Sequence, residues 1–161
     1  MPVVNKTLEE KLLSILKQSL IASCQPVDNG PMDKVEHVVA MALAAIDGGA
    51  KGLRIEGVEN VRAVAKATSI PIVGIVKRDL DNSSIRITPF VKDVEALAEA
   101  GASIIAFDGT DRDRPVAMLE LLDAVHESGC VAMADCADYD TGMMLAKHGC
   151  TFIGSTMSGY L

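Results

Sequence analysis

The 161-residue sequence has no tryptophan and only 3% aromatic residues, and its basic residues are outnumbered. It contains 15 Lys and Arg against 22 Asp and Glu, a formal net charge of −7. It has no basic run, and a tract such as VKRD carries its own acidic residue. A nucleic-acid interface needs clustered cations, so this distribution argues against one. An anionic small molecule remains compatible if a few local cations or backbone N–H groups bind it.

Long apolar segments and paired cysteines are also missing. No apolar run approaches the roughly 20 residues that a membrane-spanning helix needs, and the start MPVVNKTLEE is too polar for a signal peptide. The cysteines form no C-x-x-C pair and lie in or beside apolar runs: Cys24, Cys130, Cys136 and Cys150. We therefore predict a cytoplasmic protein with no membrane partner, whose cysteines are reduced core thiols rather than metal ligands.

Short apolar runs alternate with amphipathic segments along the whole chain. The runs predict six strands, at 20–25, 52–57, 70–77, 103–109, 130–136 and 151–156. The amphipathic segments predict helices at 7–18, 33–47, 60–67, 88–101, 114–129 and 138–149. Two helix starts carry side-chain caps in this interpretation, Thr7 with Glu10 and Asp33 with Glu36. The first helix gives the chain an N-terminal helical segment within residues 1–19.

This alternation indicates a parallel sheet covered by helices, for which two architectures compete. A doubly wound nucleotide-binding sheet usually has a G-x-G-x-x-G turn after its first strand, and the sequence has none. Instead the strands end in polar residues, as barrel enzymes require at their C-terminal rim. We therefore predict an α/β fold of the (β/α)8 TIM-barrel type. A barrel needs eight strands and typically about 250 residues, so residues 1–161 would form a single domain with six of the eight units.

Lys77 ends the apolar run VGIVK and is the first candidate for chemistry. A partly desolvated Lys at a strand end can act as a general base or form a Schiff base. Alternatively, its stem packs while its amine reaches solvent, paired with Asp79. Arg78 alternates to the other face of the strand and is expected to serve the structure.

Arg54 and Gln25 are the next polar residues at strand ends. In LRIEG, Arg54 and Glu56 share one face of the strand, so Arg54 could clamp an anion or hydroxyl group, or pair with Glu56 in the wall. Gln25 could donate to a ligand or shape the turn at Pro26.

Asp108 and Asp135 each close an apolar strand. Either could bind sugar hydroxyls or hold Lys77 protonated, and either could instead cap the helix that follows, a function that we favour for Asp108. No histidine with suitable spacing accompanies them, which argues against a transition-metal site. The three histidines fall on predicted helices and are expected at the surface or its boundary: His37, His126 and His148.

Together, eight collinear motifs resemble N-acylmannosamine-6-phosphate 2-epimerases: SCQ, ALAAIDGGAKGLRIEG, PIVGIVKRDL, ITPF, AFDGT, RP, MADC and GSTMSGY. They run from about residue 20 to 160. The resemblance implies a (β/α)8 barrel and interconversion of N-acetylmannosamine 6-phosphate and N-acetylglucosamine 6-phosphate, a step of sialic-acid catabolism. It also implies no metal or organic cofactor and a possible homodimer.

The resemblance also implies roles for individual residues. Lys77 matches the family's proton-transferring Lys, which acts at C2 of the sugar. Gln25, Arg54 and Asp135 match residues that contact substrate. The family pattern adds two more βα units, with a catalytic Glu in an AEGR-type motif and the main phosphate-binding loops, and none of these lies within residues 1–161. We therefore expect a polypeptide of these residues alone to show little epimerisation. An oligomerising remnant and a Schiff-base aldolase are the alternatives.

Overall fold

The computed structural model describes residues 2–161 as alternating strands and helices. The strands are β1 (Ile21–Cys24), β2 (Gly52–Glu56), β3 (Ile72–Ile75), β4 (Ile104–Asp108), β5 (Val131–Asp135) and β6 (Phe152–Gly154). The helices are α1 (Lys6–Leu16), α2 (Val35–Asp47), α3 (Val58–Ala67), α4 (Val91–Ala100), α5 (Met118–Glu127) and α6 (Tyr139–Lys147). The number, type and order of the predicted elements are therefore confirmed.

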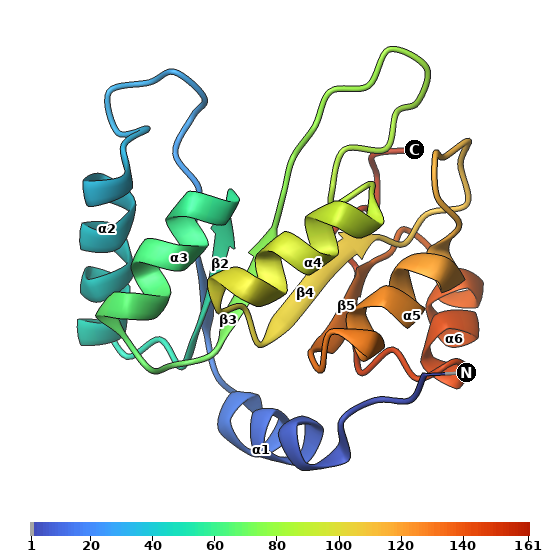
Figure 1. Cartoon of the computed structure of the whole chain (residues 1–161), viewed down its shortest axis with the longest axis horizontal. Coiled ribbons are helices and arrows are strands. Elements are labelled where there is room, and N and C mark those ends of the chain that lie inside the picture. The colour runs from blue at the N-terminus through green and yellow to red at the C-terminus, as the bar shows by residue number, and fades with distance from the viewer. Residues whose placement is uncertain (1) are drawn as a thin grey trace.

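The six strands form one parallel sheet in the order β1-β2-β3-β4-β5-β6. Each strand pairs with the next one along the chain, so the order never reverses. A doubly wound sheet would reverse at its switch point. The sheet curls, and helices α2 to α6 lie around its outer side (Figure 1). The prediction of a TIM-barrel type with six βα units is confirmed.

Two apolar clusters hold this arrangement together, one on each face of the sheet. Leu53 and Ile55 of β2 belong to the outer cluster, between the strands and the helices. Val73 and Ile104 belong to the inner cluster. Because side chains alternate along a strand, the inner row of each strand continues towards its polar end, where a ligand could enter.

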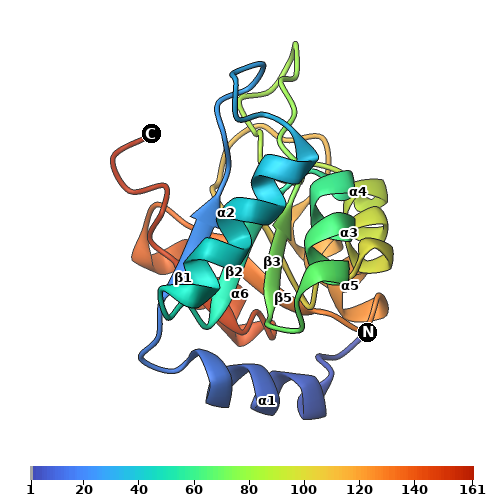
Figure 2. The same ribbon diagram turned by 90° about the vertical axis from the view of Figure 1, so that its left-hand side faces the viewer.

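Helix α1 closes the other end of the curled sheet. It lies across the N-terminal ends of the strands in both views (Figures 1 and 2). Leu12 and Leu16 of α1 join Val73, Ile104 and Val131 in the inner cluster. The interior is therefore apolar near α1 and becomes polar at the opposite rim.

The helix starts differ from those predicted. Helix α1 is capped by Asn5, whose side chain accepts from the Leu8 N–H, so the Thr7–Glu10 capping box is wrong. The cap assigned to Asp33 is also wrong, because its carboxylate accepts instead from the Asn29 N–H in the preceding turn. Several residues near a helix start can each act as the cap, and the surrounding chain decides which one does.

The loops before α4 and α5 are longer than predicted. Helix α4 begins at Val91 with Phe90 as its cap, which leaves Pro89 outside the first turn. Helix α5 begins at Met118 because the Arg114 guanidinium donates to three main-chain carbonyls, at 2.7–3.0 Å, and so holds the preceding segment as a loop.

The four cysteines are buried and free, as predicted. Burial raises the pKa of Cys130 to about 11 and that of Cys150 to about 12. The prediction for His126 is wrong: it is buried, and its Nε2 lies 3.2 Å from the Gly149 carbonyl oxygen. Among residues 2–161 there is no helix with both the length and the apolar character to cross a membrane.

Candidate active site

A cavity of about 590 Å³ lies at the C-terminal rim of the sheet. This rim is at the end of the sheet opposite α1 (Figure 1). It brings together three of the four predicted site residues, Gln25, Arg54 and Lys77. The other residues that line it are Ser23, Ser84, Arg86, Ile87, Asp108, Arg112, Thr156, Met157 and Tyr160. Residues from the ends of four strands and from the loops that follow them thus surround one space.

Arg54 and Asp135 form a two-bonded ion pair across the interior. The Arg54 Nη1 donates to Asp135 Oδ1 at 3.1 Å and Nη2 donates to Oδ2 at 2.6 Å. Asp135 is fully buried and also accepts from the Thr156 hydroxyl at 2.8 Å. Asp135, the fourth predicted site residue, thus accepts three hydrogen bonds with its carboxylate and holds the Arg54 guanidinium at the cavity wall. The alternative partner that we considered for Arg54, Glu56, is wrong.

Glu56 is instead part of the support for Lys77. Its Oε1 accepts from the Lys77 backbone N–H at 3.2 Å, between the ends of two neighbouring strands. The Lys77 side chain lines the cavity and is exposed. Of the two alternatives for Lys77, partial desolvation is therefore wrong for the chain as described, and an amine that reaches solvent is confirmed. Its expected partner is also wrong, because Asp79 pairs with Arg86 at 2.7 Å. None of the six ion pairs among residues 2–161 involves Lys77, which leaves its amine available to a ligand.

Asp108 does not cap the following helix, which corrects the function that we favoured for it. Its carboxylate accepts from the Thr110 backbone N–H and hydroxyl and from Arg112 Nη2 at 2.7 Å. The Thr110 hydroxyl in turn accepts from Arg112 Nε at 2.8 Å. Asp108 and Asp135 are partners in the register of β4 and β5, so two buried carboxylates lie side by side and each carries its own arginine.

Arg112 and Arg86 are cavity residues that the sequence analysis did not identify. Arg112 lies four residues after a strand-end Asp, within the tract DGTDR, and that spacing was the available signal. Arg86 lies in a polar loop that only folding brings to the rim. With Arg54 and Lys77 these residues give the cavity four cationic side chains. Each of the three arginines is paired with an aspartate, so the arginines offer a ligand oriented N–H groups more than net charge, and within residues 2–161 Lys77 is the one of the four without an ion pair.

Gln25 lines the cavity, and Arg78 has the structural role that its position in the strand predicts. Gln25 follows β1, and its Nε2 donates to the Ser23 hydroxyl at 2.7 Å, which orients the amide at the cavity. Arg78 points away from the cavity and pairs with the buried Asp93 of α4 at 2.6 Å, and hydrogen bonding to Asp93 raises the pKa of Arg78. Arg78 therefore ties the end of β3 to the helical layer.

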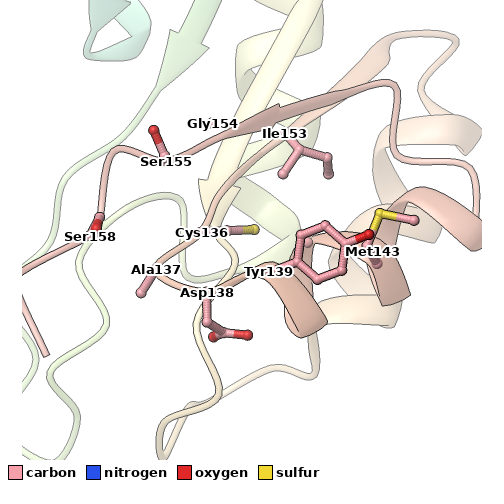
Figure 3. Close-up of a pocket in the computed structure, with 10 residues that line it drawn as sticks. Cys136, Ala137, Asp138, Tyr139, Met143, Ile153, Gly154, Ser155 and Ser158 are labelled. Atoms are coloured by element: carbon pink, nitrogen blue, oxygen red, sulfur yellow. The ribbon is translucent and has the colours of Figure 1, made fainter.

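A second hollow of about 460 Å³ lies between β6 and α6 (Figure 3). Cys136, Tyr139, Met143 and Ile153 contribute its apolar surface, and its lining residues include no Lys, Arg or His. Its one acid, Asp138, caps α6 by accepting from the Thr141 N–H and hydroxyl, and the bond from that N–H contributes most to the lowered pKa of Asp138. The rim cavity, with its lysine and arginines, is therefore the better candidate for an active site. Among residues 2–161, no three His, Cys, Asp or Glu side chains are grouped so that they could hold a metal ion.

Comparisons with known proteins show to which family the chain belongs. A family model described as "Putative N-acetylmannosamine-6-phosphate epimerase" matches residues 38–161. The chain belongs to this family. Relatives from Photobacterium profundum and Pasteurella multocida, each named "Putative N-acetylmannosamine-6-phosphate 2-epimerase", are both 55% identical over 157 residues, or 98% of the chain. The chain covers 66% and 69% of their respective lengths.

Solved structures support the same fold. The N-acetylmannosamine-6-phosphate 2-epimerase from Clostridium perfringens is 37% identical, with a TM-score of 0.88 over 93% of this chain and 66% of that one. A dihydropteroate synthase from Yersinia pestis, 16% identical with a TM-score of 0.52 over 80% of this chain and 54% of that one, is similar in fold alone. This member of the epimerase family thus spans about two thirds of the length of the relatives that it matches.

Proposed function

We propose that the complete protein interconverts N-acetylmannosamine 6-phosphate and N-acetylglucosamine 6-phosphate by epimerisation at C2. The observation that carries this proposal is the meeting of Lys77, Arg54 and Gln25 at one rim cavity, in a chain of this family. The Lys77 amine and the oriented arginine N–H groups at the cavity suit a sugar phosphate, and the cavity volume of about 590 Å³ is ample for a small metabolite.

The reaction requires a base at C2 of the open-chain sugar. The C2 proton lies next to the C1 aldehyde, so its removal gives an enolate whose negative charge is shared with the C1 oxygen. In this proposal, the neutral amine of Lys77 accepts that proton, and its ammonium form can return one. A proton delivered to the opposite face of C2 produces the epimer, whereas return to the same face regenerates the substrate.

In this proposal Arg54 binds the substrate. Its guanidinium is fixed by Asp135, so it can donate to a sugar oxygen without first losing side-chain freedom. Because Asp135 balances its charge, Arg54 acts by oriented hydrogen bonds more than by net charge. Gln25, held by Ser23, offers a neutral amide for a hydroxyl or acyl oxygen.

Replacement of Lys77 tests the proposal. In the complete protein, we expect Lys77→Ala to lower kcat for epimerisation by roughly 10²–10⁴-fold, the usual contribution of a general base, without loss of folding. Lys51→Ala is the matched control, since Lys51 is an exposed lysine just before β2, at the end of the sheet nearest α1. Equal kcat values for the wild type and Lys77→Ala would reject the proposal.

The same protein separates epimerisation from Schiff-base chemistry. A lysine that acts only as a base forms no imine with the substrate aldehyde, so borohydride should trap no covalent adduct at Lys77. A sugar-derived mass on Lys77 after borohydride treatment would instead favour the aldolase alternative.

A further inference from the structure

The parallel pairing of β3 and β4 stops short of the rim. Their register joins Val73 to Ile104 and Gly74 to Ile105, although β4 continues to Asp108 and the chain of β3 continues to Lys77. The predicted strand 70–77 therefore ends early, at Ile75. The segment 85–88, which returns from the polar loop, fills the gap between the two strand ends.

Main-chain hydrogen bonds hold this inserted segment on both sides. On the β3 side, Lys77 and Ile87 form an antiparallel bridge, the Thr88 N–H donates to the Val76 carbonyl at 2.7 Å, and the Arg78 N–H donates to the Arg86 carbonyl at 3.0 Å. On the β4 side, the Asp108 N–H donates to the Ile87 carbonyl at 3.0 Å. The segment thus lies between the two neighbouring strand ends that bear Lys77 and Asp108.

Thr88 completes the connection with its side chain. It is fully buried, and its hydroxyl donates to the Ala106 carbonyl of β4 at 2.6 Å. The same hydroxyl accepts from the Val76 N–H, beside Lys77, at 3.3 Å. One hydroxyl therefore links the two strands where a continuous ladder would bond them directly.

The backbone of Thr88 is also unusual. Its φ is +48°, in the left-handed region, which a β-branched residue rarely adopts. Among residues 2–161, the other non-glycine residues with positive φ are Gln18 and Asn29, neither of which is β-branched. Such a conformation persists where its surroundings fix it, and residues of this kind gather at functional sites.

We propose that Thr88 is a positioning residue for Lys77, the residue to which the proposed function assigns proton transfer. By linking Val76 to Ala106, the hydroxyl sets the separation of the two strand ends and hence the point from which the Lys77 side chain enters the cavity. This inference rests on the proposed function, because the placement of the Lys77 side chain affects catalysis only if Lys77 transfers the proton. It assigns Thr88 no contact with the substrate.

Two substitutions in the complete protein test the hydroxyl. Thr88→Val keeps the shape and branching but removes both hydrogen bonds, whereas Thr88→Ser keeps the hydroxyl. We expect Thr88→Val to lower kcat at least 10-fold with a change in KM of less than 3-fold, and to enlarge the isotope effect on kcat for substrate deuterated at C2. Thr88→Ser should restore kcat to within 3-fold of wild type. A loss of folded protein alone would lower the apparent kcat without changing the isotope effect.

Thr151→Val is the matched control. Thr151 precedes β6 at the opposite end of the sheet, and its hydroxyl donates to Glu9 of α1 at 2.7 Å. This variant removes a hydroxyl of the same kind and should lower the Tm while leaving kcat and the isotope effect unchanged. If Thr88→Val and Thr151→Val lowered kcat by the same factor for the same decrease in Tm, the inference would be overturned.

Hydrogen exchange gives a readout that does not depend on activity. Thr88→Val should speed exchange at the amides of Val76 and Arg78, which flank Lys77, and Thr88→Ser should not. Unchanged exchange in Thr88→Val overturns the positioning inference even if epimerisation is confirmed. Accelerated exchange in a protein that does not epimerise rejects the proposed function, while the structural link through Thr88 stands.

Discussion

Arg54 shows at the scale of single residues what strand alternation can and cannot reveal. Side chains alternate along a strand, so the segments LRIEG, GIVK and AMAD were enough to predict which face their polar residues take. Arg54, Lys77 and Asp135 take the inner face of the sheet. The partner of Arg54 could not be predicted in this way, since Asp135 lies 81 positions further along and meets it only when the sheet curls. Glu56, two residues from Arg54, was the partner that the local sequence suggested. In the structure Glu56 accepts a hydrogen bond from the Lys77 backbone N–H instead.

The two-bonded geometry of this pair predicts the effect of Arg54→Lys. Lysine keeps the charge near the buried Asp135 but cannot form the parallel pair of bonds, so we expect a loss of about 1–3 kcal/mol in the free energy of unfolding. We also expect kcat/KM for epimerisation to fall at least 10-fold, because the remaining cation is not oriented at the cavity. Urea unfolding and steady-state kinetics measure the two effects.

Arg62→Lys is the control for that substitution. Arg62 pairs with the exposed Glu59 one helical turn away, and such surface pairs contribute little. This change should leave both the free energy of unfolding and kcat/KM nearly unaltered. Equal stability of Arg54→Lys and Arg62→Lys would show that the interior ion pair is not formed as described.

The buried thiols predict a loss of stability in alkali. The pKa of Cys150 is about 12, raised mainly by burial, while an unfolded thiol titrates near 8.5. Between these values the unfolded state releases a proton that the folded state keeps, so stability falls as pH rises above about 8.5. From pH 8 to pH 10 the contribution lost is about 1–2 kcal/mol. Urea unfolding at the two pH values should therefore show a smaller decrease for Cys150→Ala than for wild type, and equal decreases would contradict the assignment.

At the scale of elements, existence and order could be predicted but boundaries could not. Six strands and six helices follow from the alternation of apolar runs with amphipathic segments, a signal spread over many residues. Helix starts depend on single hydrogen bonds, such as those to Asn5 or from Arg114, and the same local sequence allows several. The early end of β3 had no local signal either, because the segment 85–88 that replaces its pairing comes from another part of the chain.

Helix α1 provides a test at this scale. Leu12 is 2% exposed and packs into the interior cluster, whereas its neighbour Leu13 is 44% exposed. We expect Leu12→Ala to cost about 2–5 kcal/mol in the free energy of unfolding, since it opens a cavity where α1 closes the sheet. Leu13→Ala should cost less than about 1 kcal/mol. Similar losses for the two variants in urea unfolding would mean that α1 does not pack as described.

At the scale of the whole molecule, the curled sheet explains why residues far apart in sequence share one cavity. Gln25, Arg54, Lys77 and Asp108 come from four strands that all point the same way, so their ends meet at one rim. Among residues 2–161, β1 and β6 each pair with a strand on one side only. A cytoplasmic location, a homodimer and low activity of a polypeptide limited to residues 1–161 stay predictions from the sequence.

Solvent deuterium shows whether Lys77 exchanges the C2 proton of an amino-sugar phosphate. The complete protein is incubated in D2O with N-acetylmannosamine 6-phosphate, and proton NMR follows the C2 position of both epimers. We predict that the N-acetylglucosamine 6-phosphate formed carries deuterium at C2, and that Lys77→Ala slows the appearance of both the deuterium and the product by roughly 10²–10⁴-fold while Lys51→Ala does not. Undiminished deuterium incorporation at C2 in Lys77→Ala would contradict the account.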